Sequence, residues 1–276
     1  NEDMIAYKLV FGNLSIMPML GKVNQGSRDG QNNLDIGGGV SDYMVQVQYE
    51  NPETDLSLGA FAQIRTATSY GDDTPTGVNG VGGAGATRSL GFKNQSINLF
   101  TKQKFGDLSV GVEAGLQTGT NGAVMTDGVT QGSNNSFGIV GEIGYAPKTS
   151  NWTHLLKLGA ASGDDPGTKD IYEGFTFNRN YNVALLMFNH PLGSANFFRT
   201  QLIRDTTTDA SNNIDNEAIS NAVFIAPSTD YKVRDNLSFG ATLLYARLQQ
   251  DPILVNGSGA GTSKDLGFET DFRVNY

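Results

Sequence analysis

The stretch Leu266-Gly-Phe-Glu-Thr-Asp-Phe-Arg-Val-Asn-Tyr276 determines how the rest of the chain is interpreted. Successive side chains of an extended strand point to opposite sides, so residues of equal parity share a face. One face of this stretch is apolar and the other polar: Leu266, Phe268, Phe272, Val274 and Tyr276 against Gly267, Glu269, Asp271, Arg273 and Asn275. The alternation predicts a β-strand with two chemically different faces.

The same alternation recurs along all 276 residues, most cleanly at 108–116. The remaining strands are expected at 4–20, 43–49, 56–64, 87–104, 137–145, 152–158, 181–189, 195–204, 217–228 and 237–245. In the stretch 87–104 the apolar residues change from even positions (Leu90, Phe92) to odd ones (Ile97, Leu99), which predicts a β-bulge near 94–96. Short turns alternate with long polar loops between the stretches. About twelve strands in a single domain, residues 1–276, are therefore expected.

Composition narrows the class of protein. The formal charge of −9 argues against nucleic-acid binding, and the absence of cysteine rules out disulfides and thiolate metal sites. The longest aliphatic or aromatic run, Val183–Phe188, is far below the roughly 20 residues of a membrane-spanning helix. A membrane protein with this sequence has to be a barrel, in which only alternate residues face lipid. No signal peptide precedes Asn1, so a mature or trimmed chain is expected.

The closing stretch, which ends in an aromatic residue, resembles the signature of gram-negative outer-membrane β-barrels. As a whole the chain resembles an outer-membrane porin. The segments Leu158-Gly-Ala-Ala-Ser-Gly-Asp-Asp-Pro166 and Asn180-Tyr-Asn-Val183 are faintly similar to alginate-export-type porins, which have more strands. The resemblance implies an all-β, antiparallel up-and-down transmembrane barrel with short periplasmic turns and long extracellular loops. A soluble β-sandwich or solenoid is the alternative fold, but it favours shorter strands and no rotation of short and long connections.

If the apolar faces contact lipid, the polar faces line the lumen. The expected pore-lining residues are Lys8, Arg65, Lys93, Glu113, Glu142, Lys157, Arg199, Glu269, Asp271 and Arg273. These charges either order water and solutes in a transverse field or pair locally and fill the interior. The loop at 162–180 is long enough to fold inward and narrow the pore. Most acidic residues fall in the long loops, so the negative charge is expected to be extracellular.

Three functions remain open. The first is a channel for passive diffusion of small polar or anionic solutes in the bacterial outer membrane. The second is a structural or surface-interaction barrel with an occluded lumen, whose acidic loops bind divalent cations, lipopolysaccharide or another cell. The third is an outer-membrane enzyme, which we do not expect, because no hydrolase motif surrounds His154 or His190.

No cofactor is expected. The acidic loop residues Asp72, Asp73, Asp164 and Asp165 offer oxygen ligands of the kind Ca²⁺ takes, without the spacing of an EF-hand, so a solvated acidic loop is the alternative. The expected partners are outer-membrane lipid, lipopolysaccharide and small polar solutes. The sequence does not predict the oligomeric state.

Overall fold

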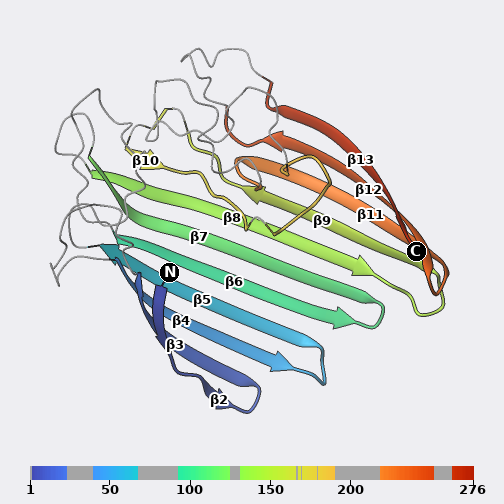
Figure 1. The fold of residues 1–276 in the computed structure, drawn as a ribbon, viewed down its shortest axis with the longest axis horizontal. Coiled ribbons are helices and arrows are strands. Elements are labelled where there is room, and N and C mark those ends of the chain that lie inside the picture. Colours follow the sequence, from blue (N-terminus) through green and yellow to red (C-terminus); the bar gives the residue numbers. More distant parts are fainter. Residues whose placement is uncertain are drawn as a thin grey trace.

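The computed structural model describes residues 2–23, 40–67, 93–124, 131–189 except 166, 169 and 179, 218–251 and 263–276. These residues form one curved 13-stranded sheet (Figure 1). The described residues contain no helix with the length and apolar character needed to cross a bilayer. The strands are β1 (Glu2–Ala6), β2 (Leu9–Phe11), β3 (Leu14–Val23), β4 (Val40–Asn51), β5 (Leu56–Ala67), β6 (Lys93–Phe105), β7 (Leu108–Val124), β8 (Gln131–Tyr145), β9 (Trp152–Ala161), β10 (Ile171–Tyr172), β11 (Ala222–Arg234), β12 (Leu237–Leu248) and β13 (Asp265–Asn275).

The strands follow one another across the sheet in the order β1-β3-β4-β5-β6-β7-β8-β9-β11-β12-β13. Every neighbouring pair in this order is antiparallel, and β2 extends β1 along the edge of β3. The short β10 lies parallel to the first part of β8. The expected all-β, antiparallel up-and-down architecture is thereby confirmed. Within the described residues β1 and β13 are the two edges of the sheet, and no pairing joins them.

Short and long connections lie at opposite edges of the sheet, as expected. The hairpins at Gly12-Asn13 and Gly106-Asp107 have two-residue turns whose glycines have φ of 59° and 61°. A positive φ at the first turn position fits a type II′ turn, which glycine adopts without strain. We call the strand ends that these hairpins join the turn edge, and the strand ends at the opposite side the loop edge. The outermost strands of the sheet, β1 and β13, are called edge strands. Both edge strands, β1 with β2 and β13, run toward the turn edge, where Asn275 pairs with Ser238.

The break between β1 and β2 has a local cause. Pairs on either side keep one register, Ala6 with Met19 and Leu9 with Ile16, so the two pieces are one strand. Pro18 lies opposite Tyr7 and has no N–H to donate; only the Tyr7 N–H bond to the Pro18 carbonyl is made, at 3.1 Å. Proline is tolerated here because one ladder bond near an edge is all that is lost.

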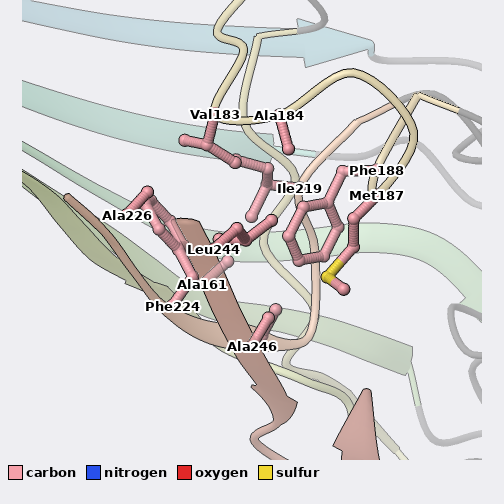
Figure 2. Packing of buried hydrophobic residues seen from close by; sticks show 11 residues of the cluster. Ala161, Val183, Ala184, Met187, Phe188, Ile219, Phe224, Ala226, Leu244 and Ala246 are labelled. Carbon is pink, nitrogen blue, oxygen red and sulfur yellow. The ribbon is translucent and has the colours of Figure 1, made fainter. Parts of the chain in front are cut away.

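The expected strand at 181–189 is wrong. Residues 171–189, which we call the inner segment, begin with β10 beside β8 and then leave the sheet to pack on one of its faces. Its apolar residues pack in adjacent pairs rather than alternate positions: Val183, Ala184, Met187 and Phe188 are buried, while Leu185 and Leu186 are exposed. Figure 2 shows these four buried side chains against Ile219, Phe224 and Leu244. The face under the inner segment is called the inner face, and the opposite one the outer face.

Four other expectations differ from the structure or lie outside it. The single strand expected at 4–20 is wrong, because the chain reverses at Gly12-Asn13 and β2 pairs with β3 as a hairpin. The bulge near 94–96 is wrong, because both ladders of β6 keep one register from its first residue to its last. The strand expected at 217–228 extends instead to Arg234, which shortens the turn to Asp235-Asn236. The strand expected at 195–204 lies outside the described residues.

Candidate functional site: the inner face of the sheet

The outer face is apolar although it is exposed. Residues paired across an antiparallel ladder share a face, and the pairs Leu99 with Ala114 and Ala114 with Ile139 place a continuous apolar row there. Exposed outer-face side chains include Val45, Leu58, Ile64, Ile97, Leu99, Leu108, Leu116, Ile139, Ile143, Leu158, Val223, Ile225, Leu243 and Val274. Such a surface far exceeds the few hundred Å² of contiguous apolar area that soluble monomers expose.

Aromatic residues mark both ends of this apolar surface. Toward the turn edge they are Phe105, Tyr145, Trp152, Tyr231, Phe239 and Tyr276, and nearer the loop edge Tyr43, Phe137, Tyr245 and Phe268. Rings in both groups contact each other, with centroids 4.7 Å apart for Trp152 with Tyr231 and for Tyr245 with Phe268. Between the two groups, the outer-face positions of the described strands carry no Asp, Glu, Lys or Arg. In the described strands the outer-face charges lie at the strand ends: Asp3, Lys22, Lys93, Arg247 and Asp265 at the loop edge, and Arg234 over the Tyr276 ring at the turn edge.

The inner face carries the opposite chemistry. The register places Lys8, Arg65, Glu113, Glu142, Lys157, Glu269, Asp271 and Arg273 there, in agreement with the parity of the sequence. Arg199 lies outside the described residues. Sequence parity also leads to inner-face charges that were not among the expected residues: Asp42, Glu50, Lys102, Lys104, Asp230 and Lys232.

Lys93 does not share this face. It pairs with Thr66 and Thr120, on the same side of β6 as Ile97 and Leu99. Its inward assignment depended on the bulge near 94–96. Because the ladder is regular there, odd positions of β6 stay on the outer face along its whole length. Lys93 therefore lies at the loop-edge end of the outer face.

Two arginines of the inner face are held by aspartates: Arg65 by Asp42 on the neighbouring strand, and Arg273 by Asp230 two strands away, across Gly240 of β12. Arg65 donates from Nε and Nη2 to the Asp42 carboxylate at 2.8 and 2.6 Å, and the Asp42 side chain is fully buried. Arg273 donates to Asp230 in the same bidentate manner at 3.1 and 2.5 Å, in a more exposed setting. Bidentate pairs fix the guanidinium in a plane, so these two cations are directed along the wall.

A second group ties the inner segment to β8 and β9. The Tyr181 hydroxyl donates to Glu142 Oε1 at 3.1 Å, and Lys157 Nζ lies 3.7 Å from the same oxygen. Lys157 Nζ also donates to the Asn182 carbonyl at 3.0 Å and sits 5.0 Å from the centre of the Tyr181 ring. Burial raises the pKa of the Tyr181 phenol, and the charge of Glu142 raises it further. The phenol therefore stays a neutral donor over the physiological range.

The C-terminal strand holds the other end of the inner segment. The Glu269 carboxylate accepts the backbone N–H groups of Leu186 and Met187 at 2.7 and 2.6 Å. Asp271 accepts the N–H of Leu185 at 3.1 Å. Three successive backbone donors thus meet two carboxylates, in the manner of a small anion-binding nest.

Glycines on the inner face make room for the aromatic residues of the inner segment. A Cβ on Gly115 would lie 2.8 Å from Phe175 Cζ, and one on Gly138 would lie 2.6 Å from Phe177 Cε1. Phe175 and Phe177 meet edge to face, with centroids 5.8 Å apart. The segment is therefore seated in a track of small residues, and a larger side chain there must displace it.

The side of the inner face away from the inner segment is hollow. A cavity of about 860 Å³ opens at the turn edge, and its lining runs from Lys8 and Val10 to Ser109 and Ala146. Lys102 and Lys104 line it as well, together with the acidic residues Glu50, Asp55 and Asp107.

The histidine and metal hypotheses acquire little support. His154 lies on the outer face between the rings of Tyr145 and Trp152, and its Nδ1 is 3.1 Å from Thr229 Oγ1. His190 lies outside the described residues, as do Asp72 and Asp73. Asp164 and Asp165 accept backbone N–H groups of Glu173 and Gly167 within their own loop. In the described part of the chain no group of three or more His, Cys, Asp or Glu side chains is placed to hold a metal ion.

The comparisons with known proteins add no relative: no family model matches the chain, and no curated protein matches it.

Proposed function

We propose that the sheet is the wall of a bacterial outer-membrane β-barrel and that the protein is a channel for passive diffusion of small polar or anionic solutes. The main support for the proposal is the outer face: in the described strands its charged side chains lie only at the two ends of the strands, while the apolar residues between them are exposed. In a lipid bilayer that exposed area is buried against hydrocarbon, whereas in water it promotes aggregation.

The dimensions of the outer face support the same environment. Phe137 and Tyr145 are eight residues apart on β8, as are Phe268 and Tyr276 at the end of the chain. Eight strand residues span roughly 27 Å, or about 21 Å along the axis of a barrel whose strands tilt by about 40°. Outer-membrane barrels have an apolar band about 25 Å tall between two aromatic girdles. The spacing of the aromatic groups suits a bilayer.

Closure of the barrel is part of the proposal. Because both edge strands run toward the turn edge, the cylinder closes through one further strand that runs the opposite way, or through parallel pairing of the two edges. The short turns then face the periplasm and the loop edge faces outward. In the closed cylinder the inner segment narrows the lumen on the side of β8 to β13, and the hollow beside β2 to β7 remains as the path for solutes.

The inner segment also favours a second candidate, a structural barrel whose lumen is occluded. The two candidates differ in permeability. Purified protein is reconstituted into planar bilayers and into liposomes, with neutral and charged sugars as osmolytes. We expect single-channel steps and liposome swelling. A protein that inserts and shows the heat-modifiable migration of a folded barrel, but gives neither steps nor swelling, would establish the occluded barrel instead.

A further inference from the structure

The lysines of the turn-edge hollow differ from the other inner-face cations. Arg65 and Arg273 are paired with aspartates, and Lys157 with Glu142. Within the described residues Lys8, Lys102 and Lys104 make no ion pair and no hydrogen bond, although all three line the same cavity. Three exposed ammonium groups thus point into one hollow without protein partners.

The carboxylates of the inner face are largely engaged elsewhere. Glu142 is bound by Tyr181 and Lys157. The other engaged carboxylates are Asp42 and Asp230, held by arginines, and Glu269 and Asp271, held by backbone N–H groups. The negative charge of these carboxylates is compensated by partners within the protein. The hollow itself is lined by three lysines and by the three acidic residues Glu50, Asp55 and Asp107, so its formal charge is zero although the whole chain carries −9.

The surroundings of Lys102 and Lys104 leave room for a ligand. The two lysines are two residues apart on one face of β6, so their Cα atoms are roughly 7 Å apart. Their cross-strand neighbours are small: Lys102 lies between Ser57 and Gly111, and Lys104 lies beside Ser109. Glu50, the acidic residue nearest in the same row, is two strands away, about 10 Å by strand spacing. Its carboxylate already accepts a hydrogen bond from Gln48 at 2.6 Å.

We infer that Lys102 and Lys104, faced by Lys8 across the hollow, form an anion-binding subsite at the turn-edge mouth of the lumen for small oxyanions, namely carboxylates and phosphates. This inference rests on the proposed function, because it takes the hollow to be part of a solute path. Two flexible lysine side chains whose Cα atoms are roughly 7 Å apart can bring both ammonium groups to the oxygens of one oxyanion, and the Ser57 hydroxyl beside Lys102 adds a neutral donor. A concave wall focuses the field of such a cluster and raises the local concentration of anions.

The test compares the wild type with two double variants of equal charge change. Lys102→Gln/Lys104→Gln removes the subsite, and Lys22→Gln/Lys93→Gln removes two lysines of the outer face. Reversal potentials are measured in planar bilayers across a KCl gradient, and citrate or inorganic phosphate is then added to block the chloride current. We expect an anion-selective wild type and control. The subsite variant is expected to lose roughly tenfold in the chloride-over-potassium permeability ratio and to lose the block by both oxyanions.

The outcomes separate this inference from the channel itself. If the wild type conducts but the two double variants have the same selectivity and block, the subsite is refuted and the channel stands. If the wild type does not conduct, the channel is refuted, and binding is decided by thermal unfolding in detergent. A rise in melting temperature with citrate or phosphate, present in the wild type and control but absent in the subsite variant, supports the subsite; no rise in the wild type overturns it.

Discussion

Replacement of Glu269 by glutamine tests how the inner segment is held. Glu269 accepts the N–H groups of Leu186 and Met187 through its two oxygens. A hydrogen bond to a charged group contributes about 1.5–3 kcal/mol, and glutamine keeps one acceptor while it presents an NH₂ group to the second N–H. Because the site is half-buried, we expect Glu269→Gln to weaken docking of the segment by about 2 kcal/mol. That loss corresponds to a roughly 30-fold larger undocked fraction.

The rate at which an introduced cysteine is labelled measures docking of the inner segment, and it does not depend on whether the protein transports solutes. The chain has no native cysteine, and Ala184 is only 9% exposed at the packed surface of the segment. In an Ala184→Cys background, Glu269→Gln is expected to raise the rate of labelling by a polar maleimide roughly 30-fold, because labelling follows the open fraction. Glu113→Gln is the matched control, since Glu113 is an inner-face carboxylate that accepts no hydrogen bond from the segment among the described residues.

Labelling rates that stay equal in the two variants would refute the view that the Glu269 carboxylate holds the segment. Gly138→Val also disturbs docking of the inner segment, but it does so without a change of charge. Its new side chain occupies the space of the Phe175 and Phe177 rings, so it is also expected to speed labelling at position 184. In bilayers, both variants should widen the distribution of single-channel conductances.

Three further predictions concern the two faces and the interior. Val112→Arg on the outer face should lower the free energy of unfolding in a bilayer by about 2–4 kcal/mol, whereas Ser109→Arg on the inner face of the same strand should change it little; equal losses in urea titrations would argue against a lipid-facing outer surface. Asp42→Asn should cost about 2 kcal/mol and Asp230→Asn less than about 1 kcal/mol by the same titration, because only the Asp42 side chain is fully buried. Because the pKa of Tyr181 is raised in the folded state, its contribution to docking is complete below the ordinary phenol pKa of about 10 and is lost only as pH rises through the folded value; Tyr181→Phe should therefore speed labelling in the Ala184→Cys background by the same factor at neutral and at mildly alkaline pH, once each rate is divided by that of a free thiol, and a factor of one would contradict this.

Much of the wall could be predicted from residue parity. The alternation at 108–116 and at the C-terminus indicates which face is apolar, and the turn at Gly106-Asp107 separates two expected strands. The hairpin at Gly12-Asn13 was missed, because the alternation was followed through it as one strand at 4–20. Residue parity gave a wrong prediction where apolar residues are buried outside a strand. Val183–Phe188 is a run of six apolar residues, and periodicity alone does not distinguish a strand from a loop that packs on a core.

The charged residues show the same limit. Lys93 was placed inward because a bulge was assumed in a strand that the structure shows to be regular. Lys102 and Lys104 were missed because their outer-face neighbours, Thr101 and Gln103, are polar, so local alternation gives no contrast. Parity carried forward from Ile97 would have found both. The bidentate partners of Arg65 and Arg273 depend on cross-strand register, which the sequence alone does not fix.

The attachment of the inner segment to β13 has a consequence for the order of assembly. The bonds from Leu185, Leu186 and Met187 to Asp271 and Glu269 join residues 82 to 86 positions apart. Such distant pairings form late in folding, because the chain between them must first be brought together. The nascent protein therefore passes through a stage in which its last strand has not yet paired and residues 185–187 are not held, although Tyr181 and Asn182 can already contact β8 and β9. Pairing of the final hairpin therefore adds the last strand to the sheet and fixes residues 185–187 on its inner face in the same step.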